Sequence, residues 1–221
     1  MNEPLIKICG LTCVEDARAA LEAGADFLGF VLYRGSPRYV SPDTLSALRR
    51  QLPESARCVG VFVNESAIEV ERVARACGLC AVQLAGEERA SEYRAFPFPV
   101  WRVVRYAAGE WTPDLNDWPA QRWVVDAAGP SYGGSGRVAD WAAAAALAGE
   151  RPVMLAGGLT PENVADAIRA VRPAGVDVSS GVERKPGQKD GDRVRLLIEA
   201  ARGVRSGAPG EATNGDQKGK R

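Results

Sequence analysis

Eight short apolar runs, separated by segments with helical patterns, are the feature that most constrains the fold of this chain. The runs cover residues 5–9, 27–31, 58–63, 81–84, 100–104, 123–127, 152–156 and 175–178. Short strands that alternate with helices indicate parallel strands joined by crossover helices. Eight such units close into a barrel, so the sequence predicts an α/β fold, a (β/α)8 TIM barrel in a single domain. An open doubly wound sheet is the alternative.

Capping residues predict where several helices begin. Thr12 and Glu15 have the spacing of a capping box, and Asn64 is a candidate cap for the third helix. A cap before a first-turn proline occurs at Ser41-Pro42 and at Thr160-Pro161. Residues 87–96 predict a short helix and residues 109–121 only a turn. The predicted apolar helix faces are Val14, Ala17, Ala20 and Leu21 in the first helix, and Ile68, Val70, Val73, Ala74 and Cys77 in the third.

The domain organisation follows from the length of 221 residues, because no linker divides the chain. We expect the barrel over residues 1–203. Residues 204–221 are polar, contain glycine and lack an apolar period, which predicts a disordered tail.

Composition restricts the partners of the protein. The chain is 46% hydrophobic and 25% charged, with 28 basic and 28 acidic side chains. Such a balance creates no broad field, so we expect neither nucleic acid nor a membrane as partner. The start at residues 1–4 does not resemble a signal peptide, and no apolar run is long enough to cross a bilayer. The sequence therefore predicts a cytoplasmic protein.

The absence of histidine narrows the chemistry, because it excludes Ser-His-Asp hydrolysis, zinc bound through histidine and imidazole acid–base catalysis. Proton transfer then falls to Cys, Asp, Glu, Lys or Tyr. The five cysteines are an odd number and do not form a secreted disulfide framework. Cys77 and Cys80 have a redox or zinc spacing but no second ligand pair, so we interpret them as structural thiols.

Barrel enzymes place their active sites at the carboxyl ends of the strands. Gly157, Gly158, Ser180 and Gly181 follow the seventh and eighth predicted strands, where barrels commonly bind phosphate through backbone N–H groups. Tight βα turns are the structural alternative. Gly134 lies in a glycine-rich segment after the sixth strand that could add a further N–H nest or form a simple loop.

Cys9 and Asp126 are the candidate proton-transfer groups. The thiol pKa lies closest to neutrality in a chain without histidine, and we expect Lys7, two residues earlier on the same strand face, to lower it. Asp126 ends an apolar run, so its pKa should be raised, as a general acid requires. A buried structural cysteine and a helix cap or loop ion pair are the alternatives.

Taken together, these segments resemble phosphoribosylanthranilate isomerase. The matching pieces are Lys7-Ile8-Cys9-Gly10-Leu11-Thr12, Gly29-Phe30-Val31, Ser36-Pro37-Arg38-Tyr39-Val40, Val59-Gly60-Val61-Phe62-Val63-Asn64, Val82-Gln83-Leu84, Val125-Asp126, Gly133-Gly134-Ser135-Gly136, Leu155-Ala156-Gly157-Gly158-Leu159 and Asp177-Val178-Ser179-Ser180-Gly181-Val182-Glu183. Most of these pieces are weak evidence for the family when taken alone. Their order and barrel spacing make the set specific.

The resemblance implies an Amadori rearrangement of N-(5-phosphoribosyl)anthranilate in tryptophan biosynthesis, with Asp126 as acid and Cys9 as base. It implies that Arg38 holds the anthranilate carboxylate and that Asp177 lies near the anthranilate amine. We expect Lys7 and Gln83 to contact the substrate as well. The phosphate would bind at Gly134, Gly157, Gly158, Ser180 and Gly181. No metal or organic cofactor is expected, and a small-molecule substrate would meet a monomer or homodimer.

The chain departs from the family pattern after the fourth strand, where Gln83-Leu84-Ala85-Gly86 replaces the usual Gln-Leu-His-Gly. Ser135 and Arg137 replace the usual Thr and Lys of the sixth loop and keep a hydroxyl and a positive charge. Rival readings are an indole-glycerol-phosphate synthase, with its lysine-rich site, and the histidine-pathway aminoaldose isomerase, with two aspartates. Cys9, at the end of the first predicted strand, argues against both of these enzymes. A non-catalytic phosphate-binding barrel is the alternative from a different class.

Overall fold

A computed structural model describes residues 3–128 and 138–204. Within these residues, eight parallel strands close into a barrel in the order β4-β3-β2-β1-β9-β8-β7-β5, and β5 pairs with β4 to complete the ring. The predicted single-domain (β/α)8 barrel is confirmed. The strands are β1 (Leu5–Ile8), β2 (Phe27–Val31), β3 (Cys58–Phe62), β4 (Ala81–Leu84), β5 (Val100–Ala107), β7 (Arg122–Asp126), β8 (Val153–Leu155) and β9 (Gly175–Val178).

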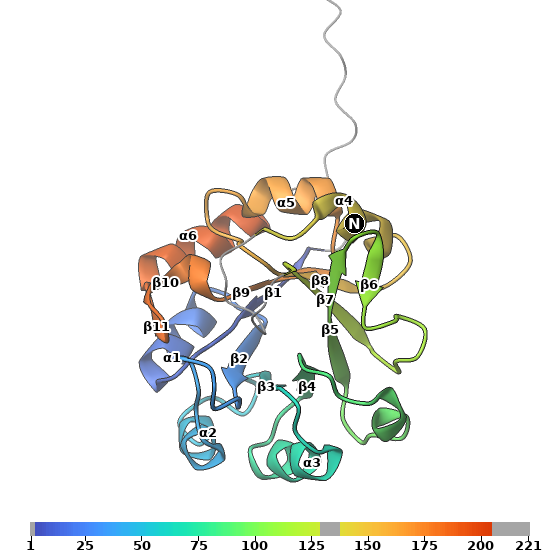
Figure 1. Cartoon of the computed structure of the whole chain (residues 1–221). Helices are drawn as coiled ribbons and strands as arrows, with labels where there is room; N and C mark the ends of the chain where they lie inside the picture. The colour runs from blue at the N-terminus through green and yellow to red at the C-terminus, as the bar shows by residue number, and fades with distance from the viewer. Residues whose placement is uncertain (1–2, 129–137, 205–221) are drawn as a thin grey trace, which may run out of the picture.

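Helices surround the ring of strands, as Figure 1 shows. They are α1 (Val14–Glu22), α2 (Pro42–Arg49), α3 (Ala67–Ala76), α4 (Trp141–Ala148), α5 (Val164–Val171) and α6 (Gly191–Arg202). A short 3-10 helix, η1 (Ala90–Tyr93), follows β4, where a short helix is predicted. No described helix is both long and apolar enough to cross a membrane.

Two parts of the chain contain strands that the sequence analysis did not predict. β6 (Glu110–Thr112) forms an antiparallel hairpin with the end of β5, in the segment expected to hold only a turn. After β9, a 3-10 turn η2 (Ser180–Val182) leads into the small hairpin of β10 (Glu183–Lys185) and β11 (Gln188–Lys189). This second hairpin lies beside the start of α1, because the Thr12 hydroxyl donates to the Gly187 carbonyl at 2.6 Å.

The core has two layers because successive strand residues point to opposite faces. Residues such as Ile6, Ile8 and Leu28 face the helices in the larger cluster. The smaller cluster fills the inside of the barrel, where Phe27 and Trp101 meet edge to face at 4.9 Å between ring centroids. Cys9 also belongs to this inner cluster. Apolar side chains therefore pack the barrel interior up to the end that carries the polar residues.

Several predicted helix boundaries are correct and others are wrong. Ser41 caps α2 by accepting from Thr44 N–H at 3.1 Å. The capping box at Thr12 is wrong, because α1 begins after Cys13 and the Thr12 hydroxyl is used by the β10–β11 turn. Ser66, and not Asn64, caps α3. The α5 helix begins at Val164 and not at Pro161.

The predicted apolar face of α3 contains one error. Val70, Val73 and Ala74 are buried, but Ile68 is 84% exposed. Ile68 stands in the first turn of the helix and faces away from the core. The predicted tail over residues 204–221 lies almost wholly outside the described residues, which end at residue 204.

Candidate active site

A cavity of about 370 Å³ opens at the carboxyl ends of the barrel strands. It lies where parallel α/β barrels place their active sites. Most of the residues selected from the sequence meet here: the lining includes Cys9, Arg38, Gln83, Asp126, Gly157, Gly158, Asp177, Ser180 and Gly181. Lys7 is fully buried beneath the cavity, and Gly134 lies outside the described residues.

Cys9 follows β1 directly and is only 8% exposed. Its backbone N–H donates to the Val178 carbonyl at 2.8 Å, which holds the residue against β9. Burial raises the pKa of the Cys9 thiol, and the nearby cations Lys7 and Lys189 lower it only in part. Lys7 therefore lowers this pKa as predicted, but the expected net lowering is wrong, because desolvation outweighs the cation.

Lys7 forms a buried ion pair inside the barrel. Its Nζ lies 2.8 Å from both carboxylate oxygens of Asp177, its register partner on β9. Burial acts to lower the Lys7 pKa, but Asp177 and Cys9 reverse this, so the net pKa of Lys7 is raised. The ammonium is thus fixed as a cation below the thiol, and Asp177 both pairs with it and lines the cavity.

Asp126 ends β7 and lines the same cavity. Burial raises its pKa, in the direction predicted from its apolar neighbours, while the Ala127 N–H and Arg105 oppose the shift. The Ala127 N–H donates to Oδ1 at 2.8 Å. Arg105 is the register partner of Asp126 on β5, and within the described residues its buried Nε and Nη2 atoms have no hydrogen-bond partner.

The glycine-rich end of the cavity is formed by the segments after β8 and β9. Gly157 and Gly158 have φ angles of 79° and 61°, a left-handed conformation that glycine adopts without steric cost. A Cβ on Gly157 would come within 2.9 Å of the Ala127 nitrogen. Ser180 and Gly181 approach from η2. Backbone therefore lines this end closely, as binding a phosphate through N–H groups requires.

Arg38 reaches the cavity from the loop after β2. Its backbone N–H donates to Ser36 Oγ at 3.1 Å. Its guanidinium forms a two-point ion pair with Glu183, from Nε at 2.9 Å and from Nη2 at 2.7 Å.

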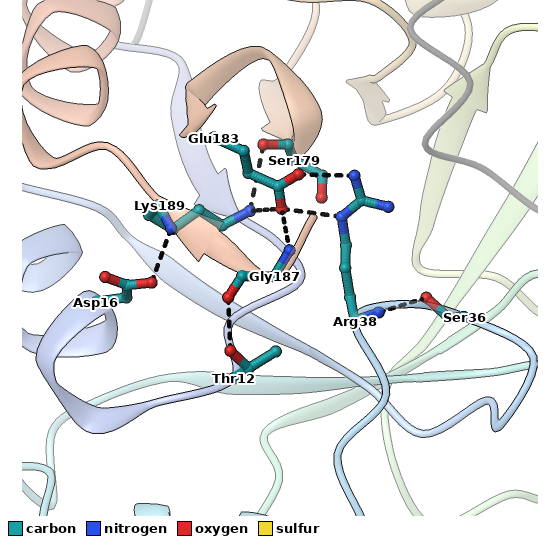
Figure 2. A network of polar contacts seen from close by, with 8 residues as sticks. All are labelled: Thr12, Asp16, Ser36, Arg38, Ser179, Glu183, Gly187 and Lys189. Carbon is teal, nitrogen blue, oxygen red and sulfur yellow. Dashed lines mark hydrogen bonds and ion pairs between the residues drawn. The ribbon is translucent and has the colours of Figure 1, made fainter. Parts of the chain in front are cut away.

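Glu183 and Lys189 are site residues that sequence reasoning missed, although Glu183 lies in a segment that carries the resemblance. Lys189 is 4% exposed, and its Nζ donates to Glu183 at 2.7 Å and to the Ser179 carbonyl at 3.2 Å (Figure 2). Burial lowers the Lys189 pKa against the opposing effect of Glu183. The pKa of Glu183 would be raised by burial, but hydrogen bonds from Arg38 and Lys189 lower it overall.

The loop after β4, where the chain has Ala85, is held by contacts of Arg102 and Glu88. Arg102 donates to the Leu84 carbonyl at 2.9 Å, to the Gly86 carbonyl at 2.6 Å and to Glu88 at 2.6 Å. Glu88 in turn accepts from the Gly86 N–H at 3.1 Å. Gln83 is buried, and its Oε1 has no hydrogen-bond partner within the described residues. The ion pair of Arg102 with Glu88 therefore holds this loop, and Ala85 packs in the inner apolar cluster.

The described residues contain no group of three or more histidine, cysteine or acidic side chains placed to hold a metal ion. Cys77 and Cys80 are free thiols, as are Cys9, Cys13 and Cys58. What the cavity offers is a buried thiol, a carboxyl group of raised pKa, fixed cations and a glycine-lined end.

These features define a (β/α)8 barrel with a buried thiol and a carboxyl group in one cavity at the carboxyl ends of its strands. A sequence model of the family described as N-(5'phosphoribosyl)anthranilate (PRA) isomerase matches residues 6–200. The chain belongs to this family, whose members are isomerases of tryptophan biosynthesis.

Curated relatives are similar over nearly the whole chain. The N-(5'-phosphoribosyl)anthranilate isomerase of Trichlorobacter lovleyi is 46% identical over 200 residues, which are 89% of this chain and 97% of that protein. The isomerase of Citrifermentans bemidjiense is 44% identical over 200 residues, 90% of this chain and 97% of that protein.

Solved structures of the family have the same fold. The phosphoribosyl anthranilate isomerase of Thermus thermophilus superposes with a TM-score of 0.82 at 37% identity, covering 91% of this chain and all (100%) of that one. The enzyme from Thermotoga maritima gives 0.80 at 40% identity, covering 90% and 99%. A further structure, 36% identical with a TM-score of 0.76 and covering 90% and 99%, is a complex with reduced 1-(o-carboxyphenylamino)-1-deoxyribulose 5-phosphate.

Proposed function

We propose that the chain converts N-(5-phosphoribosyl)anthranilate to 1-(2-carboxyphenylamino)-1-deoxyribulose 5-phosphate, with Asp126 as general acid and Cys9 as general base. The observation that carries this proposal is that a buried thiol directly after β1 and a carboxyl group of raised pKa at the end of β7 line one cavity. Family membership supplies the substrate.

In the first step, the Asp126 carboxyl group donates its proton to the furanose ring oxygen. The bond from C1 to that oxygen breaks as the nitrogen lone pair forms a C1=N bond, which gives the open-chain Schiff base. The raised pKa of Asp126 favours this step because it keeps a proton on the group closer to neutral pH.

In the second step, the Cys9 thiolate removes the proton from C2. The electrons of the C2–H bond form a C1=C2 double bond, and the electrons of the C1=N bond return to nitrogen, which gives an enolamine. Loss of the proton from the C2 hydroxyl and addition of a proton at C1 then produce the ketone. Lys7 and Lys189 favour the thiolate against the effect of burial.

The remaining residues bind the two ends of the substrate. Arg38 takes the anthranilate carboxylate, since a guanidinium binds a carboxylate through two parallel hydrogen bonds. Asp177 lies near the anthranilate amine. The phosphate binds at the glycine-lined end, on Gly157, Gly158, Ser180 and Gly181. Gly134, which lies outside the described residues, is a further proposed phosphate-binding residue. The analogue in the related complex carries both of these groups, a carboxyphenyl ring and a phosphate.

No metal or organic cofactor enters these steps. The proposed partner is the small-molecule substrate alone, without nucleic acid. We place the protein in the cytoplasm as a monomer or homodimer. A dimeric phosphoribosylanthranilate isomerase is known from Thermotoga maritima.

The direct test supplies phosphoribosylanthranilate to the purified protein and follows the fluorescence of the anthranilate group. We expect a decrease that depends on enzyme concentration, with formation of the aminoketose product. Absence of any decrease, in a protein that is folded by circular dichroism, would contradict the proposed function and favour a non-catalytic phosphate-binding barrel.

A further inference from the structure

We propose that Glu183 is a positioning residue that fixes the Arg38 guanidinium so that one defined edge is left for the carboxylate of the ligand. The inference rests on the proposed function, because it takes Arg38 as the group that binds the anthranilate carboxylate. Glu183 itself need not touch the substrate.

Arg38 has more hydrogen-bond donors than Glu183 occupies. A guanidinium carries five N–H groups along two edges that suit a carboxylate. Glu183 occupies the edge formed by Nε and Nη2. The donors that remain are both hydrogens of Nη1 and one of Nη2, and the two that point outward, one on each nitrogen, form the second edge. A second carboxylate can therefore bind Arg38 in the same plane, on the edge next to Glu183.

Glu183 is itself held in place from a second direction. Besides Arg38, it accepts from Lys189 Nζ at 2.7 Å and from the Gly187 N–H at 3.3 Å. Lys189 is anchored by its own backbone N–H, which donates to Asp16 on α1 at 2.8 Å. Figure 2 shows this cluster between the β10–β11 hairpin and Arg38. Rotation of the Glu183 side chain would therefore break several buried contacts at once.

The stem of Arg38 is confined as well. Gly10, with a φ of 75°, lies directly beneath it, and a Cβ at this position would be 2.5 Å from Arg38 Cδ. Because glycine has no side chain, it leaves room for the aliphatic stem of Arg38 to pass. With the stem and one guanidinium edge both fixed, the orientation of the second edge is determined before a ligand arrives, which reduces the ordering cost of binding.

Charge alone predicts the opposite effect of Glu183. Arg38 and Lys189 share one carboxylate, so the cluster keeps a net positive charge. Removing the negative charge of Glu183 would make the site more positive and should strengthen the binding of an anion. Positioning predicts weaker binding, because the guanidinium loses its fixed plane. The two explanations differ in sign.

Calorimetry measures the dissociation constants of two probes. One is reduced 1-(o-carboxyphenylamino)-1-deoxyribulose 5-phosphate, and the other is the same molecule without the carboxylate on its ring. The variants are Glu183→Gln, Glu183→Gln with Lys189→Met, Arg38→Ala, and Arg38→Ala with Glu183→Gln. The variant that combines Glu183→Gln with Lys189→Met removes both ion pairs of Glu183 with no change in the net charge of the cluster, and it leaves no unpaired buried lysine if Glu183→Gln alone fails to fold.

We expect both Glu183 variants to bind the carboxylate probe roughly tenfold more weakly, the size of one hydrogen bond to a charged group. Binding of the probe without a carboxylate should change less than twofold by the same reasoning. In an Arg38→Ala background, Glu183→Gln should cause no further loss. If Glu183 had a merely structural role, the loss of affinity would not depend on both the ligand carboxylate and Arg38.

Unchanged or tighter binding of the carboxylate probe to the Glu183 variants would overturn the inference, and so would an equal loss for both probes. If the wild-type protein and Arg38→Ala bind both probes alike, the carboxylate role of Arg38 in the proposed function fails, and this inference falls with it. A normal Arg38 effect without a Glu183 effect overturns the inference alone.

Discussion

Cys9 and Asp126 line one cavity and are both buried, yet burial has opposite consequences for the two proposed roles. Desolvation disfavours the charged form of each group and raises both pKa values. For Asp126, which must donate a proton, this is favourable. For Cys9, which must act as thiolate, it is unfavourable. The same barrel interior therefore prepares the acid and hinders the base.

The surroundings of the two groups differ accordingly. Cys9 has two buried lysines near it, Lys7 below and Lys189 beside the cavity, and both lower its pKa. Asp126 receives a backbone N–H from Ala127 and the fields of Arg105 and, more weakly, Lys7, which act against its protonated form. Fixed cations therefore matter most where burial opposes the proposed chemistry, which is at Cys9. Removing a lysine near Cys9 should therefore lower activity, whereas removing Arg105 near Asp126 should not.

The largest effects are expected from the two groups themselves. Cys9→Ser and Asp126→Asn should each reduce kcat by roughly 10²–10⁴-fold, since each removes one proton-transfer group. Steady-state kinetics by fluorescence measures the loss, and thermal unfolding checks that each variant is folded. Near-normal turnover in either variant would remove that residue from the mechanism.

A smaller loss of activity is expected from Lys7→Met. The change leaves Asp177 buried without its cation and removes the main group that lowers the Cys9 pKa. The thiolate fraction near neutral pH falls, so kcat/KM falls with it and its alkaline limb moves to higher pH. Breaking a buried ion pair should also lower the free energy of unfolding by about 3–5 kcal/mol.

The pH dependence of thiol alkylation, with Cys9→Ser as the blank, measures the Cys9 pKa of Lys7→Met directly. A pKa equal to that of the wild-type protein would show that Lys7 does not act on the thiol. Urea unfolding measures the loss of stability separately.

The smallest effect, and of opposite sign, is expected from Arg105→Met. Arg105 lowers the pKa of Asp126, so its removal should raise that pKa and move the acid limb of kcat/KM to higher pH. Activity on the plateau should rise a few-fold or stay level, because more Asp126 is protonated. A large loss of activity with an unmoved acid limb would instead assign Arg105 a direct contact with the substrate, which its unpartnered N–H groups would permit.

The eight barrel strands could be predicted because each is a short apolar run with a helix on either side. Cys9 and Asp126 could be selected because barrel topology brings strand ends together. Glu183 and Lys189 were missed as a pair, because their ion pair depends on a two-strand hairpin that leaves no apolar pattern. The wrong sign for the Cys9 pKa has a related cause: Lys7 is visible in the sequence, but the depth of burial is not.

The central claim, that Asp126 is the acid and Cys9 the base, is tested most directly by the pH dependence of kcat/KM in Asp126→Asn. An unperturbed thiol titrates well above a carboxyl group, and burial raises both pKa values, so we expect a bell in the wild-type protein. Its acid limb reports ionisation of Asp126, and its alkaline limb reports ionisation of Cys9.

Without Asp126, the rate should follow the thiolate fraction alone. The account predicts that kcat/KM of Asp126→Asn rises with pH across the former plateau and levels off at the pKa of Cys9. A variant profile that keeps both wild-type limbs and is lowered only by a constant factor would contradict the assignment.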